Sequence, residues 1–259
     1  MSRPPSPLPR PAVLVTGGAR RIGALVARAF ADAGWDVIIH HKHSEPEARA
    51  LAAGLPGART LACDLTDGDA AVAMVEQLCA ELTNWRVLVN CAAVFEFDGP
   101  DRLDPDVFSH AMAINAVTPA RMTQAFLRGA KARGGRRVID FLDQKLANIN
   151  PDFFSYTMAK SAFSAAMQMQ AMALTDPADR IYGLAPGAMM PSFDQQPEEH
   201  LVSGRMNLLG RLNDPAELAD AALFLAQGWL ASGQTLYIDS GQHLFRQPRD
   251  VLYLARGQS

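Results

Sequence analysis

The chain has 259 residues, of which 49% are hydrophobic and 20% are charged, a balance typical of one globular domain with a buried core. Its net charge of −3 and its pI near 6.1 give no reason to expect nucleic acid or an anionic membrane as a partner. No run of eighteen apolar residues occurs, which argues against a membrane span. We therefore expect a protein that binds small molecules.

The cysteines and the first residues bear on the compartment and on the domain limits. Cys63, Cys79 and Cys91 lie in unrelated settings without CxxC spacing, so neither a disulfide framework nor a metal site is predicted, and a reducing, cytoplasmic compartment is favoured. The first eleven residues contain five prolines and no apolar stretch. Residues 1–11 are therefore predicted to be a disordered leader, and residues 12–259 a single catalytic domain.

From residue 12 onward, short apolar or β-branched runs alternate with longer amphipathic stretches, as in repeated βαβ units. The pattern predicts strands at Ala12–Thr16, Asp36–His40, Arg59–Cys63, Arg86–Val89, Arg137–Phe141, Arg180–Leu184 and Thr235–Ile238. It predicts helices near Arg20–Ala33, Glu45–Ala53, Asp67–Leu82, Pro105–Lys131, Pro151–Leu174 and Pro215–Ala226. Right-handed crossovers then give an α/β fold, a single-domain Rossmann-type sheet of seven parallel strands, doubly wound and flanked by helices.

The first predicted strand runs into a glycine-containing loop that opens a helix, Thr16-Gly-Gly-Ala-Arg-Arg-Ile-Gly23. Gly17 lets the backbone approach a pyrophosphate, and Gly23 lets the helix pack closely on the strand. Arg20 and Arg21 are cations at the positive end of the helix dipole, which is unfavourable, and a bound anionic ligand would compensate for this repulsion. Two solvated arginines at a helix start are the alternative.

The second predicted strand is followed by a basic turn, His41-Lys-His-Ser44. It has no Asp or Glu where an NAD-binding protein would hold the ribose 2′-hydroxyl. Lys42, His43 and Ser44 can donate hydrogen bonds to a 2′-phosphate, so the sequence favours NADPH over NADH. A polar surface loop is the alternative. A metal site is not expected, because adjacent residues of an extended chain point to opposite faces.

Tyr156 and Lys160 are four residues apart in a predicted helix, so they share one face. The ammonium of Lys160 is expected to lower the pKa of the Tyr156 phenol toward neutrality, and Tyr156 can then act as a proton donor. Such a pair is common by chance, but its position after the glycine loop makes it informative.

These elements, in this order, resemble the short-chain dehydrogenase/reductase superfamily from residue 12 to residue 241. The resemblance implies that Asn115 completes the catalytic set with Tyr156 and Lys160, by bending its helix and holding a relay water. It also implies that this is a homo-oligomer, a tetramer in many relatives. Further cofactor contacts are implied at Ile22, His40, Asp64, Leu65, Asn90, Ala92, Pro186, Gly187 and Ser192.

Two departures from the superfamily pattern resemble its pteridine reductase and dihydromonapterin reductase branch. Arg21 stands in place of a glycine, and Asp143 in place of the serine thirteen residues before Tyr156. An ionised Asp143 would repel a ketone oxygen that gains negative charge, whereas it can accept hydrogen bonds from N–H groups. The resemblance implies that Phe95 stacks on a pterin ring, with Arg21 and Met189 also in contact with the substrate.

The expected activity is NADPH-dependent reduction of a pterin-like C=N bond, with Tyr156 as the proton donor. One alternative is a carbonyl reductase in which a protonated Asp143 donates a hydrogen bond, and another is a non-catalytic NADPH-binding sensor. The polar, methionine-bearing segment Pro191–Leu209 is expected to be a substrate lid. The tail 242–259 is a candidate for contact with a neighbouring chain's active site.

Overall fold

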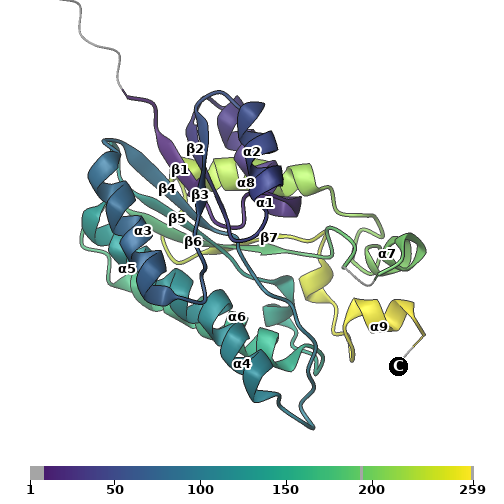
Figure 1. Cartoon of the computed structure of the whole chain (residues 1–259). Coiled ribbons are helices and arrows are strands. Elements are labelled where there is room, and N and C mark those ends of the chain that lie inside the picture. Colours follow the sequence, from purple (N-terminus) through teal and green to yellow (C-terminus); the bar gives the residue numbers. More distant parts are fainter. Residues whose placement is uncertain (1–8, 193–194, 258–259) are drawn as a thin grey trace, which may run out of the picture.

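The apolar runs of the sequence form the centre of the molecule. The computed structural model describes residues 9–192 and 195–257, and within them a seven-stranded sheet has the order β3-β2-β1-β4-β5-β6-β7 with every pair parallel (Figure 1). The predicted fold class is confirmed. The strands are β1 (Ala12–Val15), β2 (Asp36–His41), β3 (Ala58–Ala62), β4 (Trp85–Asn90), β5 (Arg137–Phe141), β6 (Arg180–Pro186) and β7 (Thr235–Ile238).

Helices cover both faces of the sheet, which explains why its strands are apolar on both sides (Figure 1). In β1, Val13 and Val15 pack into one core and Leu14 packs into the other, as the alternation of a strand requires. The first core is closed by α1 (Arg21–Asp32), α2 (Glu45–Ala53) and α8 (Pro215–Gln227). The second is closed by α3 (Gly68–Glu81), α4 (Pro105–Met112), α5 (Thr118–Gly129) and α6 (Phe154–Met172).

The prediction of one continuous α-helix near Pro105–Lys131 is wrong for the middle of this segment. A π-helical turn, η1 (Ala113–Val117), separates α4 from α5. Such a turn adds one residue to the helical ring without changing the amphipathic pattern much, so periodicity does not reveal it. The turn shifts the face on which Asn115 lies, and it therefore positions a predicted site residue.

The structure adds short elements that the sequence pattern did not predict. Helix α7 (Pro197–Ser203) lies in the predicted lid, and α9 (Val251–Ala255) lies in the tail. Two 3₁₀ turns, η2 (Gln144–Ala147) and η3 (Gln242–Leu244), follow β5 and β7. Helices α7 and α9 contact each other beside the carboxyl ends of the strands (Figure 1).

The end of the predicted leader is docked on the fold. Residues 1–8 lie outside the described residues, but Arg10 donates from Nε to the carbonyl of Gly34 at 2.8 Å and lies 3.7 Å from the carboxylate of Asp36. The backbone N–H of Asp36 donates to the carbonyl of Pro11. The last residues of the predicted disordered leader are therefore held by contacts with Gly34 and Asp36 at the start of β2.

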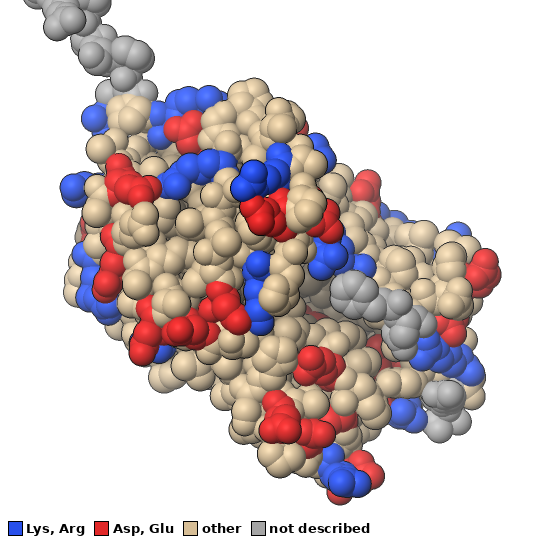
Figure 2. Space-filling model, viewed as in Figure 1, with Lys and Arg blue, Asp and Glu red and all other residues tan. Residues whose placement is uncertain are grey.

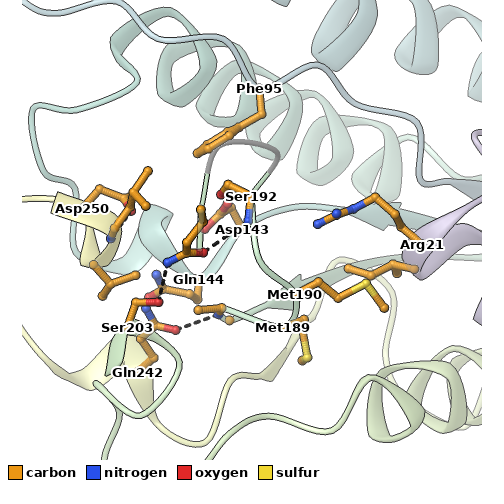
Figure 3. A pocket seen from close by; sticks show the side chains of 16 residues that line it. Arg21, Phe95, Asp143, Gln144, Met189, Met190, Ser192, Ser203, Gln242 and Asp250 are labelled. Atoms are coloured by element: carbon orange, nitrogen blue, oxygen red, sulfur yellow. Dashed lines mark hydrogen bonds between the residues drawn. The ribbon is translucent and has the colours of Figure 1, made fainter. Parts of the chain in front are cut away.

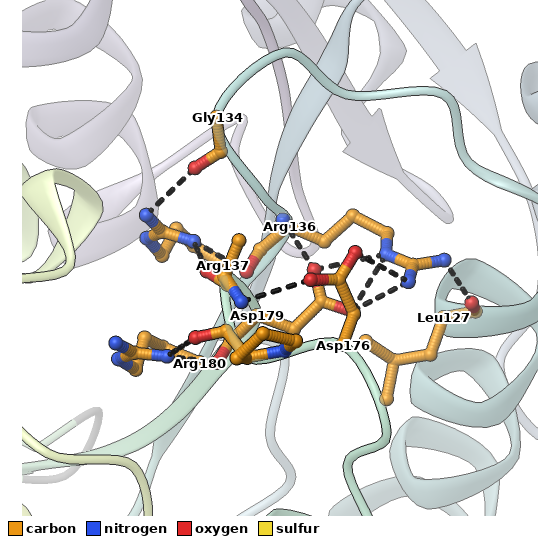
Figure 4. Close-up of polar contacts among 9 residues, drawn as sticks. Leu127, Gly134, Arg136, Arg137, Asp176, Asp179 and Arg180 are labelled. Atoms are coloured by element: carbon orange, nitrogen blue, oxygen red, sulfur yellow. Dashed lines mark hydrogen bonds and ion pairs between the residues drawn. The ribbon is translucent and has the colours of Figure 1, made fainter.

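A polar cluster joins the amino ends of β5 and β6, opposite the end where ligands bind in such sheets (Figure 4). Arg136 donates from Nε to both carboxylate oxygens of Asp179, at 2.9 and 3.1 Å, and from another nitrogen to the carbonyl of Leu127. Arg137 donates to the carbonyl of Ala178 at 2.6 Å. The cluster is structural, since it satisfies the buried carboxylate of Asp179.

The strand order reverses between β1 and β4, so the loops after these two strands separate at one edge of the sheet. The hydroxyl of Thr16 holds them together by accepting from the backbone N–H groups of Cys91, at 2.9 Å, and Ala92, at 3.0 Å. This edge is where the sequence placed its candidate site.

The surface shows no large region of one charge on the face drawn in Figure 2, where acidic and basic side chains are interspersed. Among the described residues, no helix has the length and apolar character needed to cross a membrane. All three cysteines are unpaired in this structure.

The close approach of the first loop to its own helix gives a test of the fold. A Cβ on Gly23 would lie 2.3 Å from the carbonyl oxygen of Gly17, so Gly23→Ala must push the loop away. We expect a loss of about 1–3 kcal/mol in the free energy of unfolding, measured by denaturant titration. Gly54→Ala is the control, because its Cβ would first meet the Leu51 carbonyl at 3.6 Å. Equal stability of the two variants would contradict this packing.

Candidate functional site

The two residues that the sequence placed thirteen positions apart are in direct contact. Asp143 follows β5, and Tyr156 is in the first turn of α6. The Tyr156 hydroxyl donates to Oδ2 of Asp143 at 2.7 Å, while Oδ1 accepts from the backbone N–H of Lys145 at 2.8 Å. The carboxylate is therefore fixed by the turn that it caps, with one oxygen aimed at the phenol.

The electrostatics of Tyr156 differ from the expectation. Burial, and then the adjacent Asp143 carboxylate, raise the pKa of the Tyr156 phenol well above its usual range. The ammonium of Lys160 lies 6.0 Å from the ring centroid and donates to the carbonyl of Phe141 at 2.6 Å. The expectation that Lys160 lowers this pKa is wrong for the protein alone, because burial and then the Asp143 carboxylate raise it. Tyr156 is a neutral phenol that can give a proton.

Asn115 lies in the π-helical turn and is 1% exposed. Its Oδ1 accepts from the backbone N–H of Val94 and its Nδ2 donates to the carbonyl of Val94, both at 2.9 Å. The side chain thus holds the loop after β4 in place. The implied bend of the helix is present as the π-helical turn, and the implied relay water remains a prediction.

That loop presents Phe95 to the site. Its ring stacks on Phe153, with centroids 3.9 Å apart and planes 24° apart, and it meets Tyr156 edge to face at 4.7 Å. Phe95 is 42% exposed, so part of its surface remains open to a ligand. A flat heterocycle can gain from such a ring.

Tyr156 contacts both Asp143 and Phe95, but Tyr156, Lys160 and Asn115 are not lining residues of the pocket. Asp143 and Phe95 do line this one open pocket, at the carboxyl edge of the sheet (Figure 3). Arg21 and Asp250 lie on opposite sides of it, and Phe95 lies above Asp143 in this view. The residues that the sequence predicted and that line it are Arg21, Ile22, Phe95, Asp143, Gly187, Met189 and Ser192. Sequence reasoning missed Gln144, Ala188, Met190, Gln195, Ser203, Gln242, Asp250, Val251 and Leu252.

Arg21 is held toward this pocket by an unusual backbone conformation. Its φ of 51° lies in the left-handed region, which a side chain rarely adopts, and its guanidinium donates to the carbonyl of Pro191 at 2.8 Å. The strain, the pocket and the departure from glycine agree with a functional role for this arginine.

The loop before α1 is shaped for close backbone contact. Gly17 has a φ of 63°, and a Cβ there would lie 3.0 Å from the Cα of Ala92. The first turn of α1 contains no acidic residue. Its free N–H groups and positive dipole end can therefore receive a phosphate.

His40 supports this loop from below and does not line the pocket. The backbone N–H of Gly17 donates to Nδ1 of His40 at 3.1 Å, so Nε2 carries the proton and donates to the carbonyl of Cys63 at 3.1 Å. Burial lowers the pKa of His40 to about 4. The neutral imidazole thus joins the loops after β1 and β3.

The basic turn after β2 is accessible. Lys42 pairs with Asp64 at 2.9 Å, and this hydrogen bond lowers the pKa of the Asp64 carboxyl to about 2. His43 is exposed and Ser44 is half-buried at the start of α2. Arg20 lies 3.7 Å from Glu47 on the same surface. A bound phosphate would compete with these carboxylates for the cations.

Some predicted cofactor residues have side chains that point into the interior. Asn90 donates to Asp140 at 2.8 Å and to Thr123 at 3.1 Å, so its side chain is not available to a ligand. The side chain of Leu65 is part of the second core. Asp140 is itself buried, and burial raises the pKa of its carboxyl to about 7. Only the backbones of Asn90 and Leu65 remain candidates for cofactor contact.

The remaining predicted cofactor residues border the site through their backbone. Pro186 ends β6, and a Cβ on Gly187 would lie 2.8 Å from the Cβ of Asp239 and 2.8 Å from Oε1 of Gln242. The Gln242 side chain accepts from the N–H of Ala188 at 3.0 Å. These contacts fix the wall of the pocket beside β6.

Comparison with known proteins now identifies the family. The family model described as Enoyl-(Acyl carrier protein) reductase matches residues 17–243, which include the glycine loop, Asp143, Tyr156 and Lys160. The chain belongs to the short-chain dehydrogenases/reductases. The resemblance inferred from the sequence is therefore confirmed, and the protein is an oxidoreductase of this superfamily.

Several relatives in the superfamily are similar over most of the chain. The crystal structure of FolM Alternative dihydrofolate reductase 1 from Brucella suis in complex with NADP is 31% identical, covers 92% of this chain and 96% of its own, and has a TM-score of 0.85. Dihydromonapterin reductase from Citrobacter koseri is 23% identical over 92% of this chain and 98% of its own. A 7alpha-hydroxysteroid dehydrogenase from Escherichia coli is 27% identical over 88% of this chain and 92% of its own.

The buried imidazole of His40 predicts an acid-dependent loss of stability. Its pKa is about 4 in the folded state, below the ordinary value of 6.5, so its contribution is present above pH 6.5 and is lost as the pH falls toward 4. We expect the stability advantage of the wild type over His40→Gln to shrink by about 2–3 kcal/mol across this window, as measured by denaturant titration. His43→Gln, at an exposed histidine, is the control. A pH-independent advantage would contradict a neutral His40.

Proposed function

We propose that this protein is an NADPH-dependent reductase of a pterin-like C=N bond. The observation that carries the proposal is the hydrogen bond, 2.7 Å long, from the Tyr156 hydroxyl to the carboxylate of Asp143, which lines a pocket together with Phe95 and Arg21. The similarity to dihydromonapterin reductase and to the FolM structures supports the same substrate class.

The cofactor assignment is supported by the shape and charge of two loops. Gly17 and the first turn of α1 would hold the pyrophosphate, because a side chain at Gly17 would meet Ala92. Lys42, His43 and Ser44 would receive the 2′-phosphate, which would take the place of the Asp64 carboxylate as the partner of Lys42. The printed description of the similar FolM structures includes NADP. When bound, NADPH supplies the hydride.

Tyr156 supplies the proton that the reduction requires. As a C=N carbon gains a hydride, its nitrogen gains an electron pair and becomes strongly basic, so even a phenol with a raised pKa can protonate it. The bond from the Tyr156 oxygen to hydrogen breaks and a nitrogen–hydrogen bond forms. Lys160 stays close to the tyrosinate that results and stabilises its charge.

Asp143 and Phe95 orient the ring. A pterin carries N–H groups beside its carbonyl, and a carboxylate accepts strong hydrogen bonds from such donors. Phe95 offers a partly exposed aromatic ring above Asp143, and Arg21 lies across the pocket from Asp250 (Figure 3). The substrate would therefore lie flat against Phe95 with its N–H groups toward Asp143.

A ketone or alcohol substrate is the second candidate, because the hydroxysteroid dehydrogenase relative also matches most of the chain, 88% of it. In that case Asp143 would have to be protonated, since an ionised carboxylate beside the reacting oxygen would repel its developing charge. The Asp143 variants described below separate the two substrates.

Assembly and compartment remain predictions. Several large apolar side chains are exposed on the α4–α6 layer, including Val117, Met158, Met169 and Met172. Exposed apolar groups of this kind are compatible with the predicted homotetramer. Light scattering after size-exclusion chromatography measures the number of chains in the assembly.

The three unpaired cysteines agree with the predicted cytoplasmic location.

Replacing the proton donor tests the mechanism. Tyr156→Phe removes the hydroxyl and keeps the ring, so we expect kcat for dihydrobiopterin or dihydromonapterin to fall by about 10²–10⁴-fold while NADPH still binds. NADPH absorbance measures turnover, and quenching of protein fluorescence measures binding. Tyr237→Phe is the matched control, because Tyr237 lies on β7 and stacks on His243, whereas Tyr156 contacts Asp143 of the pocket lining. Pterin reduction by Tyr156→Phe at the wild-type rate would remove this residue from the reaction.

Asp143 variants test the substrate class. Asp143→Asn keeps the size but removes the charge, and Asp143→Ser restores the residue usual in the superfamily. We expect both to lower kcat/KM for pterins by about tenfold or more, because one charge-assisted hydrogen bond is lost. We expect Asp143→Ser alone to raise turnover of a small ketone. If the wild type reduces ketones and no pterin, the proposed substrate class is wrong.

A further inference from the structure

The segment after β7 returns to the pocket of its own chain. Residues 245–257 follow η3, and α9 lies beside the start of α6 and beside α7 (Figure 1). Asp250, Val251 and Leu252 line the pocket together with Phe95 and Asp143. The tail, which the sequence made a candidate for contact with a neighbouring chain's active site, therefore forms one wall of the pocket in its own chain.

Leu252 makes the central contact of this wall. It is 4% exposed and forms a small apolar cluster with Phe153 and Tyr156, which are 5% and 7% exposed. This cluster is separate from the two cores of the sheet. The side chain of a tail residue thus covers the proton donor.

An aromatic contact extends the cluster along the tail. The ring of Tyr253 stacks on Phe153 with centroids 6.0 Å apart and planes 28° apart, and it meets Phe97 at 5.7 Å. The guanidinium of Arg249 lies 4.9 Å from the Tyr253 ring. Phe153 is therefore packed between Phe95, which faces the pocket, and the tail.

Buried charges fix the start of α9. Arg249 donates from Nε to both oxygens of Asp152 at 2.9 Å, and the backbone N–H of Asp250 donates to Asp152 at 2.7 Å. Lys145, only 3% exposed, lies 3.6 Å from the carboxylate of Asp250 and donates to the carbonyl of Asp152. Removing one partner from such a buried set leaves a charge uncompensated, so the tail is held firmly.

The pocket that remains is small. Its volume is about 170 Å³, compared with roughly 300–1,000 Å³ for sites that enclose drug-sized ligands. A single bicyclic ring with a short side chain suits this space better than a ring with a long aromatic arm. The wall made by Leu252 is the part that could be withdrawn without altering the cofactor loops.

We propose that the tail sets the upper size of the substrate, with Leu252 as a specificity-determining residue and the Arg249–Asp152 pair as the contact that positions it. This inference rests on the proposed function, because the substrates used to test it are pterins. The protein then prefers compact pterins with a short side chain, and it disfavours dihydrofolate, whose aminobenzoyl-glutamate arm is long.

The experiment compares two substrates in four proteins. We measure kcat/KM for dihydrofolate and for dihydromonapterin, with NADPH, in the wild type, Leu252→Ala, Arg249→Ala and Leu254→Ala. The ratio of the two values cancels differences in the amount of folded enzyme. We expect the dihydrofolate to dihydromonapterin ratio to rise about tenfold or more in Leu252→Ala and Arg249→Ala. Leu254→Ala, the same change on the same helix outside the pocket lining, should leave the ratio unchanged.

Arg249→Lys separates positioning from general damage, because it keeps a cation for Asp152. It should restore part of the wild-type ratio, whereas a purely structural effect would lower both kcat/KM values and leave the ratio constant. Unchanged ratios in Leu252→Ala and Arg249→Ala, with normal thermal unfolding, overturn the proposal. A wild type that reduces dihydrofolate as well as dihydromonapterin overturns it too.

The failure of the proposed function is distinguishable from the failure of this inference. If the wild type reduces no pterin but reduces ketones, the proposed function is wrong, and the same ratio is measured with a bulky and a small ketone. A ratio that still rises in Leu252→Ala supports the size limit, and a constant ratio overturns it. Turnover with neither class overturns both proposals.

Discussion

A parallel sheet requires that every strand end at the same edge, and the site of this protein depends on that constraint. The loops that follow β1, β4, β5 and β6 contribute Gly17, Phe95, Asp143 and Gly187 respectively, although these residues are far apart in the chain. The reversal of strand order between β1 and β4 opens space at this edge. Thr16 then ties the two diverging loops together through its hydroxyl.

The second constraint is electrostatic and concerns Tyr156. Burial disfavours the charged form of this phenol, and the Asp143 carboxylate, which accepts directly from the hydroxyl, disfavours it further, while the Lys160 ammonium donates to the Phe141 carbonyl. The phenol pKa is therefore raised. This balance suits transfer of a proton to a basic nitrogen, and it offers less to a developing oxyanion, whose stabilisation needs donors and not an acceptor.

Much of the fold and part of the site could be predicted from the sequence, because they depend on local patterns. Apolar alternation located the strands, the helical spacing of Tyr156 and Lys160 indicated one pair, and the resemblance to the superfamily singled out Asp143. The π-helical turn at Asn115 was not predictable, because it leaves the amphipathic pattern of the helix intact. The ring of contacts around Leu252 depends on residues about a hundred positions apart, such as Asp152 and Arg249, and only the fold brings them together. The side-chain partner of Asn90 was not predictable either, because the buried Asp140 faces it from the next strand, and the contact of Asn90 with the cofactor stays a prediction for its backbone.

The loops that start the chain's sheet and the tail segment that lines the pocket are far apart in the sequence, so natural variation can change one without the other. The glycine loop and the basic turn that are proposed to hold the nucleotide lie in the first half of the chain, whereas α9 comprises only Val251–Ala255. A substitution, insertion or exchange within those codons changes the shape of the pocket while the glycine loop and the proton donor stay as they are. Reductases with the same catalytic pair could in this way diverge in the metabolites they accept, with most of the ancestral gene unaltered.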